Sequence, residues 1–114
     1  MNSKNAFIRN EYISRINRVI DYIENNIDGE LSLNILSEIA SFSKFHFHRI
    51  FYGMMNETLN DFIKRQRLEF SVTKLFFNFN NSITDVALNC GFSSSANFAR
   101  AFKDYFGVSP SDAR

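Results

Sequence analysis

The sequence predicts an all-α fold of about seven helices, in which two similar helical segments are joined by one long helix. Three observations predict it. Apolar residues recur at steps of three and four, the period of an amphipathic helix. Residues 58–79 contain no Gly or Pro, and a short pattern before them returns after them. The chain therefore divides into residues 1–57, with a first helix and the first segment, the linker helix 58–79, and residues 80–114, with the second segment and the start of a final helix.

Length and composition fit a small soluble domain. With 114 residues, 45% of them hydrophobic and 22% charged, the chain can bury a core of its own. Its one cysteine, Cys90, excludes an internal disulfide and favours a reducing compartment. The opening residues lack the apolar core of a signal peptide, and no apolar run is long enough to span a membrane. We therefore expect a cytoplasmic protein that contacts no membrane.

The charge is distributed unevenly along a chain whose net charge is only +1. The segment from Ser43 to Leu75 has six basic and three acidic side chains, whereas the segment from Met1 to Leu31 has four basic and five acidic ones. Net charge alone does not indicate a nucleic-acid partner, so the distribution is the more informative quantity.

A first helix is predicted from about Asn10 to Ile27. Isoleucines recur there at steps of three and four and lie on one stripe of the helix: Ile13, Ile16, Ile20, Ile23 and Ile27. We expect this helix to be a packing element that ends at the turn signal Asp28-Gly29. The polar residues 1–9 are expected to fray.

A short helix, a tight turn and a longer helix come next. Ser32 can cap the short helix, which runs through Ile39, and Ser43 can cap the longer one, from Lys44 to about Met55. The longer helix has an expected inner stripe of Phe47, Ile50, Phe51 and Met54 and an outer stripe of Phe45, His48, Arg49 and Tyr52. This order of elements is a helix-turn-helix.

The long linker helix is predicted from Thr58 to Phe79. Thr58 lies three residues before Asp61, as in a capping box, and good helix formers follow. At about 1.5 Å per residue, such a helix spans roughly 31 Å, close to the roughly 34 Å repeat of the DNA double helix. Elements at its two ends are thus expected to lie about one DNA turn apart.

The helix-turn-helix order then returns. Ser82 with Asp85 is a second start that resembles a capping box, and Ser93 or Ser94 caps the longer helix that follows. The buried stripe of that longer helix is expected to be Phe98, Ala101, Phe102 and Tyr105. A last helix begins at Ser109-Pro110, with a cap and a proline in its first turn.

The two helix pairs can be aligned with each other. In the short helices and the turns after them, Leu36, Ala40, Ser41 and Phe42 match Val86, Cys90, Gly91 and Phe92 at a spacing of 50 residues. In the longer helices, Phe47, Arg49 and Phe51 match Phe98, Arg100 and Phe102 at a spacing of 51. Gly91 can adopt positive φ where the first copy has Ser41. Only two copies exist, and the long helix between them does not suit a stacked solenoid.

Two stretches closely resemble the two-part DNA-binding domain of the AraC/XylS transcriptional regulators: SFSKFHFHRIFYGMMNETLNDFIKRQRLE and SITDVALNCGFSSSANFARAFKDYFGVSP. The resemblance covers roughly residues 31–114. It implies seven helices, two helix-turn-helix subdomains joined by a long helix, and recognition helices that enter adjacent major grooves of one DNA site. That family usually ends this domain with Tyr-Arg, whereas this chain has Ala113-Arg114.

The base-reading positions of that family fall in both recognition helices. In the first they are Phe45, His48 and Arg49, which agree with the outer stripe expected from spacing alone; in the second they are Ser95, Ala96, Ala99 and Arg100. Each arginine is a strong candidate because a guanidinium can donate two parallel hydrogen bonds to guanine O6 and N7. Phe45 suits a thymine methyl, and partial burial against the long helix is its alternative.

Residues near the starts of the recognition helices are candidates for phosphate contacts: Ser43, Lys44, Ser93, Ser94 and Asn97. Backbone N–H groups and the helix dipole favour a phosphate there, although the serines would cap the helices in any case. Small neighbours leave Arg100 nearly alone, so we expect the first subdomain to supply most base discrimination. Lys64, Arg65 and Arg67 are expected to form a solvated face, with the DNA backbone as their alternative contact.

Other chemistry has little support in the sequence. His46 and His48 point about 200° apart on a helix and cannot share a metal. We expect neither an enzyme nor a cofactor, because no glycine-rich phosphate loop, carboxylate pair or Ser/His/Asp spacing is present. The alternative function is a helical protein–protein interaction module without DNA specificity, whose affinity for DNA would not fall steeply with salt.

Double-stranded DNA is therefore the expected partner, and the resemblance adds RNA polymerase. Members of that family generally carry an effector-binding or dimerisation domain. We expect this domain to be absent from the chain and the chain to be a fragment of a longer regulator. A free-standing small activator is the alternative.

Overall fold

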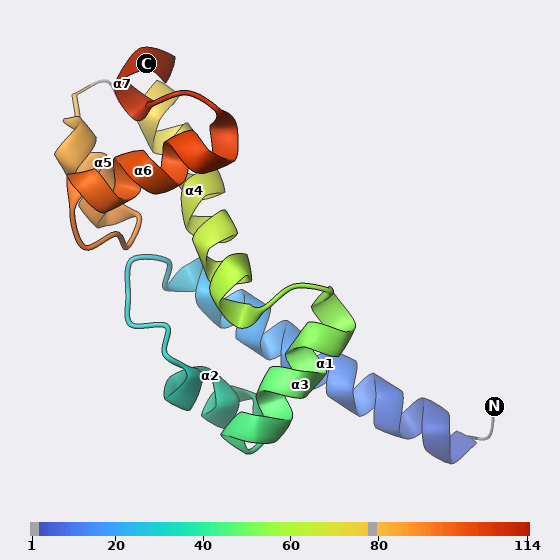
Figure 1. Ribbon diagram of the computed structural model, residues 1–114. Helices are drawn as coiled ribbons and strands as arrows, with labels where there is room; N and C mark the ends of the chain where they lie inside the picture. The colour runs from blue at the N-terminus through green and yellow to red at the C-terminus, as the bar shows by residue number, and fades with distance from the viewer. Residues whose placement is uncertain (1–2, 78–79) are drawn as a thin grey trace. The chain divides into compact units, whose positions relative to one another are not determined.

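The computed structural model describes residues 3–77 and 80–114, which form an all-α structure without strands (Figure 1). The helices described are α1 Ser3–Asn25, α2 Leu33–Ala40, α3 Lys44–Met55, α4 Leu59–Phe77, α5 Ile83–Asn89, α6 Ser95–Phe106 and α7 Pro110–Ala113. Within these residues, no helix has both the length and the apolar character that crossing a membrane requires. The predicted fold class and the two helix-turn-helix pairs, α2–α3 and α5–α6, are confirmed.

The chain forms two compact units. Unit 1 comprises Met1–Asn26 and Glu30–Ile63, and unit 2 comprises Ile27–Gly29 and Lys64–Arg114. The continuous helix α4 therefore contributes its first residues to unit 1 and the remainder to unit 2. The short loop segment Ile27–Gly29 belongs to unit 2 although the residues on both sides of it belong to unit 1. The division of the sequence at residues 57 and 79 stays a prediction.

The core of unit 1 is built where α1 contacts α2 and α2 contacts α3. Its buried hydrophobic residues are Ile16, Val19, Ile23, Leu36, Ala40, Phe47, Phe51, Leu59, Phe62 and Ile63. Edge contacts between aromatic rings extend the core from α3 into the start of α4, because the Phe51 and Phe62 rings meet at 5.4 Å. The isoleucine stripe of the first helix is thus confirmed as a packing face over its middle part.

Two predictions about α1 and α3 are wrong. α1 begins at Ser3 instead of fraying to Asn10, since residues 3–9 contain no helix breaker and a helix propagates once nucleated. Met54 does not lie on the inner stripe of α3. It belongs to the last turn of the helix, is 40% exposed, and lines a shallow hollow with Ile8 and Ile13 of α1.

The linker helix has the predicted start. Thr58 precedes α4, and its hydroxyl oxygen accepts a hydrogen bond from the Asp61 N–H at 3.1 Å, as a capping residue does. α4 then runs without interruption through 19 residues to Phe77. Asn78 and Phe79, which were predicted to complete it, lie outside the described residues.

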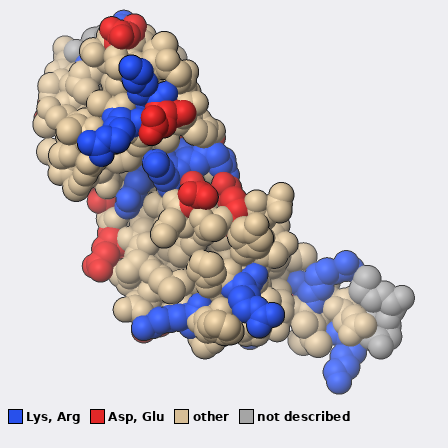
Figure 2. Space-filling view, in the orientation of Figure 1, with Lys and Arg blue, Asp and Glu red and all other residues tan. Residues whose placement is uncertain are grey.

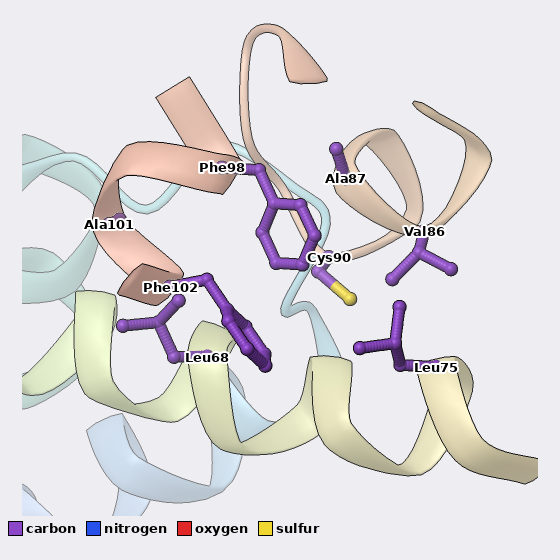
Figure 3. Packing of buried hydrophobic residues seen from close by; sticks show 8 residues of the cluster. All are labelled: Leu68, Leu75, Val86, Ala87, Cys90, Phe98, Ala101 and Phe102. Carbon is purple, nitrogen blue, oxygen red and sulfur yellow. The ribbon is translucent and has the colours of Figure 1, made fainter. Parts of the chain in front are cut away.

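The core of unit 2 gathers α4, α5 and α6 around one cluster (Figure 3). Its buried members are Leu68, Leu75, Val86, Ala87, Cys90, Phe98, Ala101 and Phe102. Figure 3 shows the larger of these side chains gathered between α4, α5 and α6, with the sulfur of Cys90 near Phe98, Val86 and Leu75. Tyr105 was predicted on the buried stripe but is 48% exposed; its hydroxyl reaches Glu69 Oε1 at 3.4 Å, which favours an exposed position.

Cys90 is a buried apolar residue, as predicted, and burial raises the pKa of its thiol to about 11. Above pH 9 the folded state then keeps a proton that the unfolded state releases, so stability should fall as pH rises from about 9 toward 11. The slope is on the order of 1 kcal/mol per pH unit. Urea unfolding at pH 8, 9 and 10 measures it, with Cys90→Ala as the comparison that lacks the thiol. An identical pH dependence in both proteins would contradict the assignment.

The two helix-turn-helix turns are built alike. In the first, the Ser41 and Phe42 N–H groups donate to the Glu38 and Ser37 carbonyls; in the second, Gly91 and Phe92 donate to Leu88 and Ala87. Ser41 has φ 59° and Gly91 has φ 92°, so both residues adopt the left-handed conformation. The duplication predicted at a spacing of 50 residues is therefore present in the backbone as well as in the sequence.

Candidate nucleic-acid interface

The outer face of α3 is exposed, as predicted. Ser43 caps the helix, because its side-chain oxygen accepts the His46 N–H at 3.2 Å. Phe47 and Phe51 anchor the helix in the core, which turns Phe45, His48 and Arg49 outward. Phe45 is 76% exposed, so the alternative that it is partly buried against the long helix does not hold.

Arg49 and Phe45 together form an apolar surface with a cationic edge. The guanidinium carbon of Arg49 lies 5.8 Å from the centre of the Phe45 ring. A shallow hollow of about 360 Å³ lies beside them, lined by Leu33 of α2 and by Lys44, Phe45, His48 and Arg49 of α3. On the face that Figure 2 draws, Lys and Arg side chains lie among uncharged residues, together with some Asp and Glu side chains. The surface formed by Phe45 and Arg49 can contact both the apolar and the hydrogen-bonding groups of a base edge.

The second recognition helix, α6, presents less side-chain chemistry. Ala96 and Arg100 are exposed, whereas Ser95 and Ala99 are half-buried. Arg100 is near a partner on its own helix, since its NH1 group lies 3.5 Å from the Asn97 Oδ1 atom. All four predicted residues thus lie on one helix, but two of them expose little surface.

The candidates for phosphate contact lie at helix starts. Ser94, not Ser93, caps α6, because its side-chain oxygen accepts the Asn97 N–H at 3.1 Å. Ser93 accepts a hydrogen bond of 2.7 Å from the side-chain amide of Asn97. Ser43 has the equivalent capping role in α3, and Lys44 next to it is exposed. In each helix the serine cap already accepts one first-turn N–H group, and the assignment of phosphate contacts stays a prediction.

Arg67 does not belong to a solvated face, in contrast to the prediction. Its Nε donates to the Ile27 carbonyl at 3.0 Å and its NH2 donates to the Gly29 carbonyl at 3.0 Å. Burial lowers the pKa of its guanidinium. Sequence reasoning missed this contact because no local pattern connects a helix residue with a loop 38 to 40 positions earlier. Within the described residues, no group of three His, Cys, Asp or Glu side chains could hold a metal.

A family model described as a helix-turn-helix domain matches residues 36–114. Among curated relatives, an uncharacterised HTH-type transcriptional regulator of Staphylococcus aureus (strain COL) is 36% identical over 100 residues. That match covers 88% of this chain and only 13% of the relative. The HTH-type transcriptional activator AarP of Providencia stuartii is 33% identical over 98 residues, which cover 86% of this chain and 72% of AarP.

Solved structures share the fold. A transcriptional regulator from Chromobacterium violaceum, described with AraC-type DNA-binding domain-containing proteins, superimposes with a TM-score of 0.80 at 23% identity and covers 89% of both chains. The DNA-binding domain of AdpA, solved in complex with a target DNA, gives a TM-score of 0.79 at 22% identity and covers 83% of this chain and 85% of that one. These likenesses establish that two helix-turn-helix pairs around a long helix are a recurring architecture.

Proposed function

The chain belongs to the AraC/XylS family of helix-turn-helix transcriptional regulators, and from this premise we propose that it binds specific sequences of double-stranded DNA through α3 and α6. The observation that carries the proposal is the exposed face of α3. A large aromatic ring that is 76% exposed, beside an arginine, is unfavourable in water but suits contact with base edges.

In the proposal, α3 supplies most of the base discrimination. Arg49 donates two hydrogen bonds to a guanine, Phe45 contacts a thymine methyl, and His48 bonds a base edge through either ring nitrogen. On α6, Arg100 is the principal base-reading residue, and Ser95, Ala96 and Ala99 allow close approach of the backbone. The half-buried positions of Ser95 and Ala99 support this unequal division of roles.

Phosphate contacts at the helix starts fix the register of the protein on the duplex. Ser43 and Lys44 serve the first recognition helix, and Ser93, Ser94 and Asn97 serve the second. Capping does not prevent this role, because a serine hydroxyl that accepts from the backbone can still donate its own proton. Such contacts carry affinity without sequence information.

The linker α4 connects the two recognition helices in this mechanism. Its 19 residues correspond to about 28 Å, near the roughly 34 Å helical repeat that separates adjacent major grooves. Bending the duplex so that both helices engage would cost on the order of 1 to 6 kcal/mol, which the second set of contacts offsets.

RNA polymerase is the further partner in the proposal, and no reaction or cofactor is assigned. The relatives differ in size around the shared region, since the chain spans 13% of the Staphylococcus regulator but 72% of AarP. The shared region is therefore a small part of the Staphylococcus regulator and most of AarP.

Binding-site selection from random duplexes, followed by a salt titration on the selected site, tests the function. We expect a recovered consensus and an affinity that falls steeply and linearly on a log–log plot against salt, because phosphate binding releases counterions. A scrambled duplex of equal length is the control. No enrichment, together with a flat salt dependence, would overturn the proposal and favour the protein–protein interaction module.

A further inference from the structure

The side chain of Arg15 of α1 contacts the turn of the first helix-turn-helix. Its NH1 group donates to the Ser41 carbonyl at 3.1 Å, and its guanidinium carbon lies 4.8 Å from the centre of the Phe42 ring. The arginine side chain is 27% exposed, and its Nε pairs with Glu11 one turn earlier at 3.1 Å. One side chain thus contacts two groups of the same turn: the carbonyl of Ser41, which is the residue in the left-handed conformation, and the ring of Phe42, which follows it.

Ring contacts continue from this turn into the first turn of α3. The Phe42 ring meets the His46 ring at 5.0 Å, and Tyr12 of α1 meets both rings, at 5.1 Å and 6.0 Å. His46 directly follows Phe45 in the recognition helix and receives the cap of Ser43 through its backbone N–H. The entry of α3, where the candidate base-reading face begins, is therefore braced by two side chains of α1.

A related placement of an arginine occurs in unit 2, although its hydrogen bonds go to the Ile27 and Gly29 carbonyls and not to a carbonyl of the turn. The buried residues Ile16, Val19 and Ile23 of α1 correspond to Leu68, Ser71 and Leu75 of α4 at a spacing of 52, and each is at most 1% exposed. That alignment pairs Arg15 with Arg67. The Nε atom of Arg67 lies 2.5 Å from the position that a Cβ on Gly91 would take, so it also lies against the turn of its own unit.

We infer that Arg15 is a positioning residue for DNA recognition, which holds the Ser41–Phe42 turn and thereby sets the orientation of α3. The inference rests on the proposed function. It extends the DNA-reading unit to α1, a helix outside the region 36–114 that the family model matches. Arg15 acts through the turn, because its donor group is bound to the Ser41 carbonyl in the protein itself.

Arg15→Ala tests the inference, with Arg18→Ala as the matched control. Arg18 is an exposed arginine three residues further along α1, so its replacement removes the same charge without touching the turn. In the free protein, we expect the Ser41 and Phe42 amides to exchange hydrogen about tenfold faster in Arg15→Ala and unchanged in Arg18→Ala, because the turn opens more often.

On the selected duplex, Arg15→Ala should bind about tenfold more weakly, toward the lower end of the roughly 5- to 150-fold loss expected for a bidentate base contact. On a scrambled duplex it should bind like Arg18→Ala. The slope of affinity against salt should match that of Arg18→Ala, since a direct phosphate contact would lower the slope by about 1.

Each other outcome overturns the inference. A lowered salt slope with unchanged amide exchange would make Arg15 a phosphate contact. Unchanged specific affinity would mean that the turn needs no support from α1. If the unaltered protein selects no duplex, the proposed function fails, and the role of Arg15 in DNA recognition fails with it. The hydrogen-exchange measurement still reports whether the Arg15 contacts stabilise the Ser41–Phe42 turn.

Discussion

Gly91→Ala is expected to destabilise unit 2 by roughly 2 to 5 kcal/mol, the largest stability effect predicted among Gly53, Gly91 and Gly107. Gly91 has φ 92°, a conformation that costs an alanine about 1 to 2 kcal/mol. The new Cβ would also lie 2.5 Å from the Ile27 carbonyl oxygen and 2.5 Å from Arg67 Nε. Relieving such overpacking typically costs a further 1 to 3 kcal/mol or so. Urea unfolding measures the sum.

Two other glycines separate the causes. Gly107 has φ 86° but nothing within 4 Å of its Cβ position, so Gly107→Ala should cost only the backbone strain, about 1 to 2 kcal/mol. Gly53 lies inside α3 with open space around it, so Gly53→Ala should stabilise the chain by roughly 0.5 to 1 kcal/mol. If Gly91→Ala costs no more than Gly107→Ala, the close approach of Arg67 and Ile27 has no energetic importance.

Local patterns predicted the helices and the exposed face of α3 because both depend on residues close in sequence. The caps at Ser32, Ser43 and Ser82 and the outward direction of Phe45 follow from hydrogen bonds and helix periodicity within a few residues. Errors occurred at helix ends. The last turn of α3 passes the edge of the core, so the periodicity that buries Phe51 does not bury Met54.

The contacts of the two arginines, by contrast, could not be predicted from local patterns. Arg15 reaches a carbonyl 26 residues away, and Arg67 reaches two carbonyls 38 and 40 residues away. The correspondence between α1 and α4 was also missed, because it rests on burial: Val19 and Ser71 are equally buried but differ in polarity. The buried hydroxyl of Ser71 is satisfied by the Leu68 carbonyl, which lets a polar residue occupy a core position.

Arg49→Ala is expected to weaken binding to the selected duplex by about 1 to 3 kcal/mol, or roughly 5- to 150-fold, if the guanidinium reads a guanine. Arg49→Lys should recover little of that loss, since an ammonium keeps the charge but not the two parallel donors. Arg100→Ala should have a smaller effect, because Arg100 lies within reach of Asn97 and its helix offers fewer neighbours. Fluorescence anisotropy with the selected duplex and with duplexes changed at single positions measures both affinity and specificity.

Loss of base reading and loss of a phosphate contact give different results in this series. Without the base contact, Arg49→Ala should discriminate less at one base position while its affinity for scrambled DNA changes little. A phosphate contact would instead weaken binding to all sequences alike and reduce the salt slope by about 1.

Replacing Phe45, His48 and Arg49 together should alter the preferred sequence more than replacing the corresponding residues of α6. Base discrimination follows from the side chains that each recognition helix exposes. Equal effects of the two replacements would therefore contradict the unequal division and show that both subdomains read sequence to the same extent.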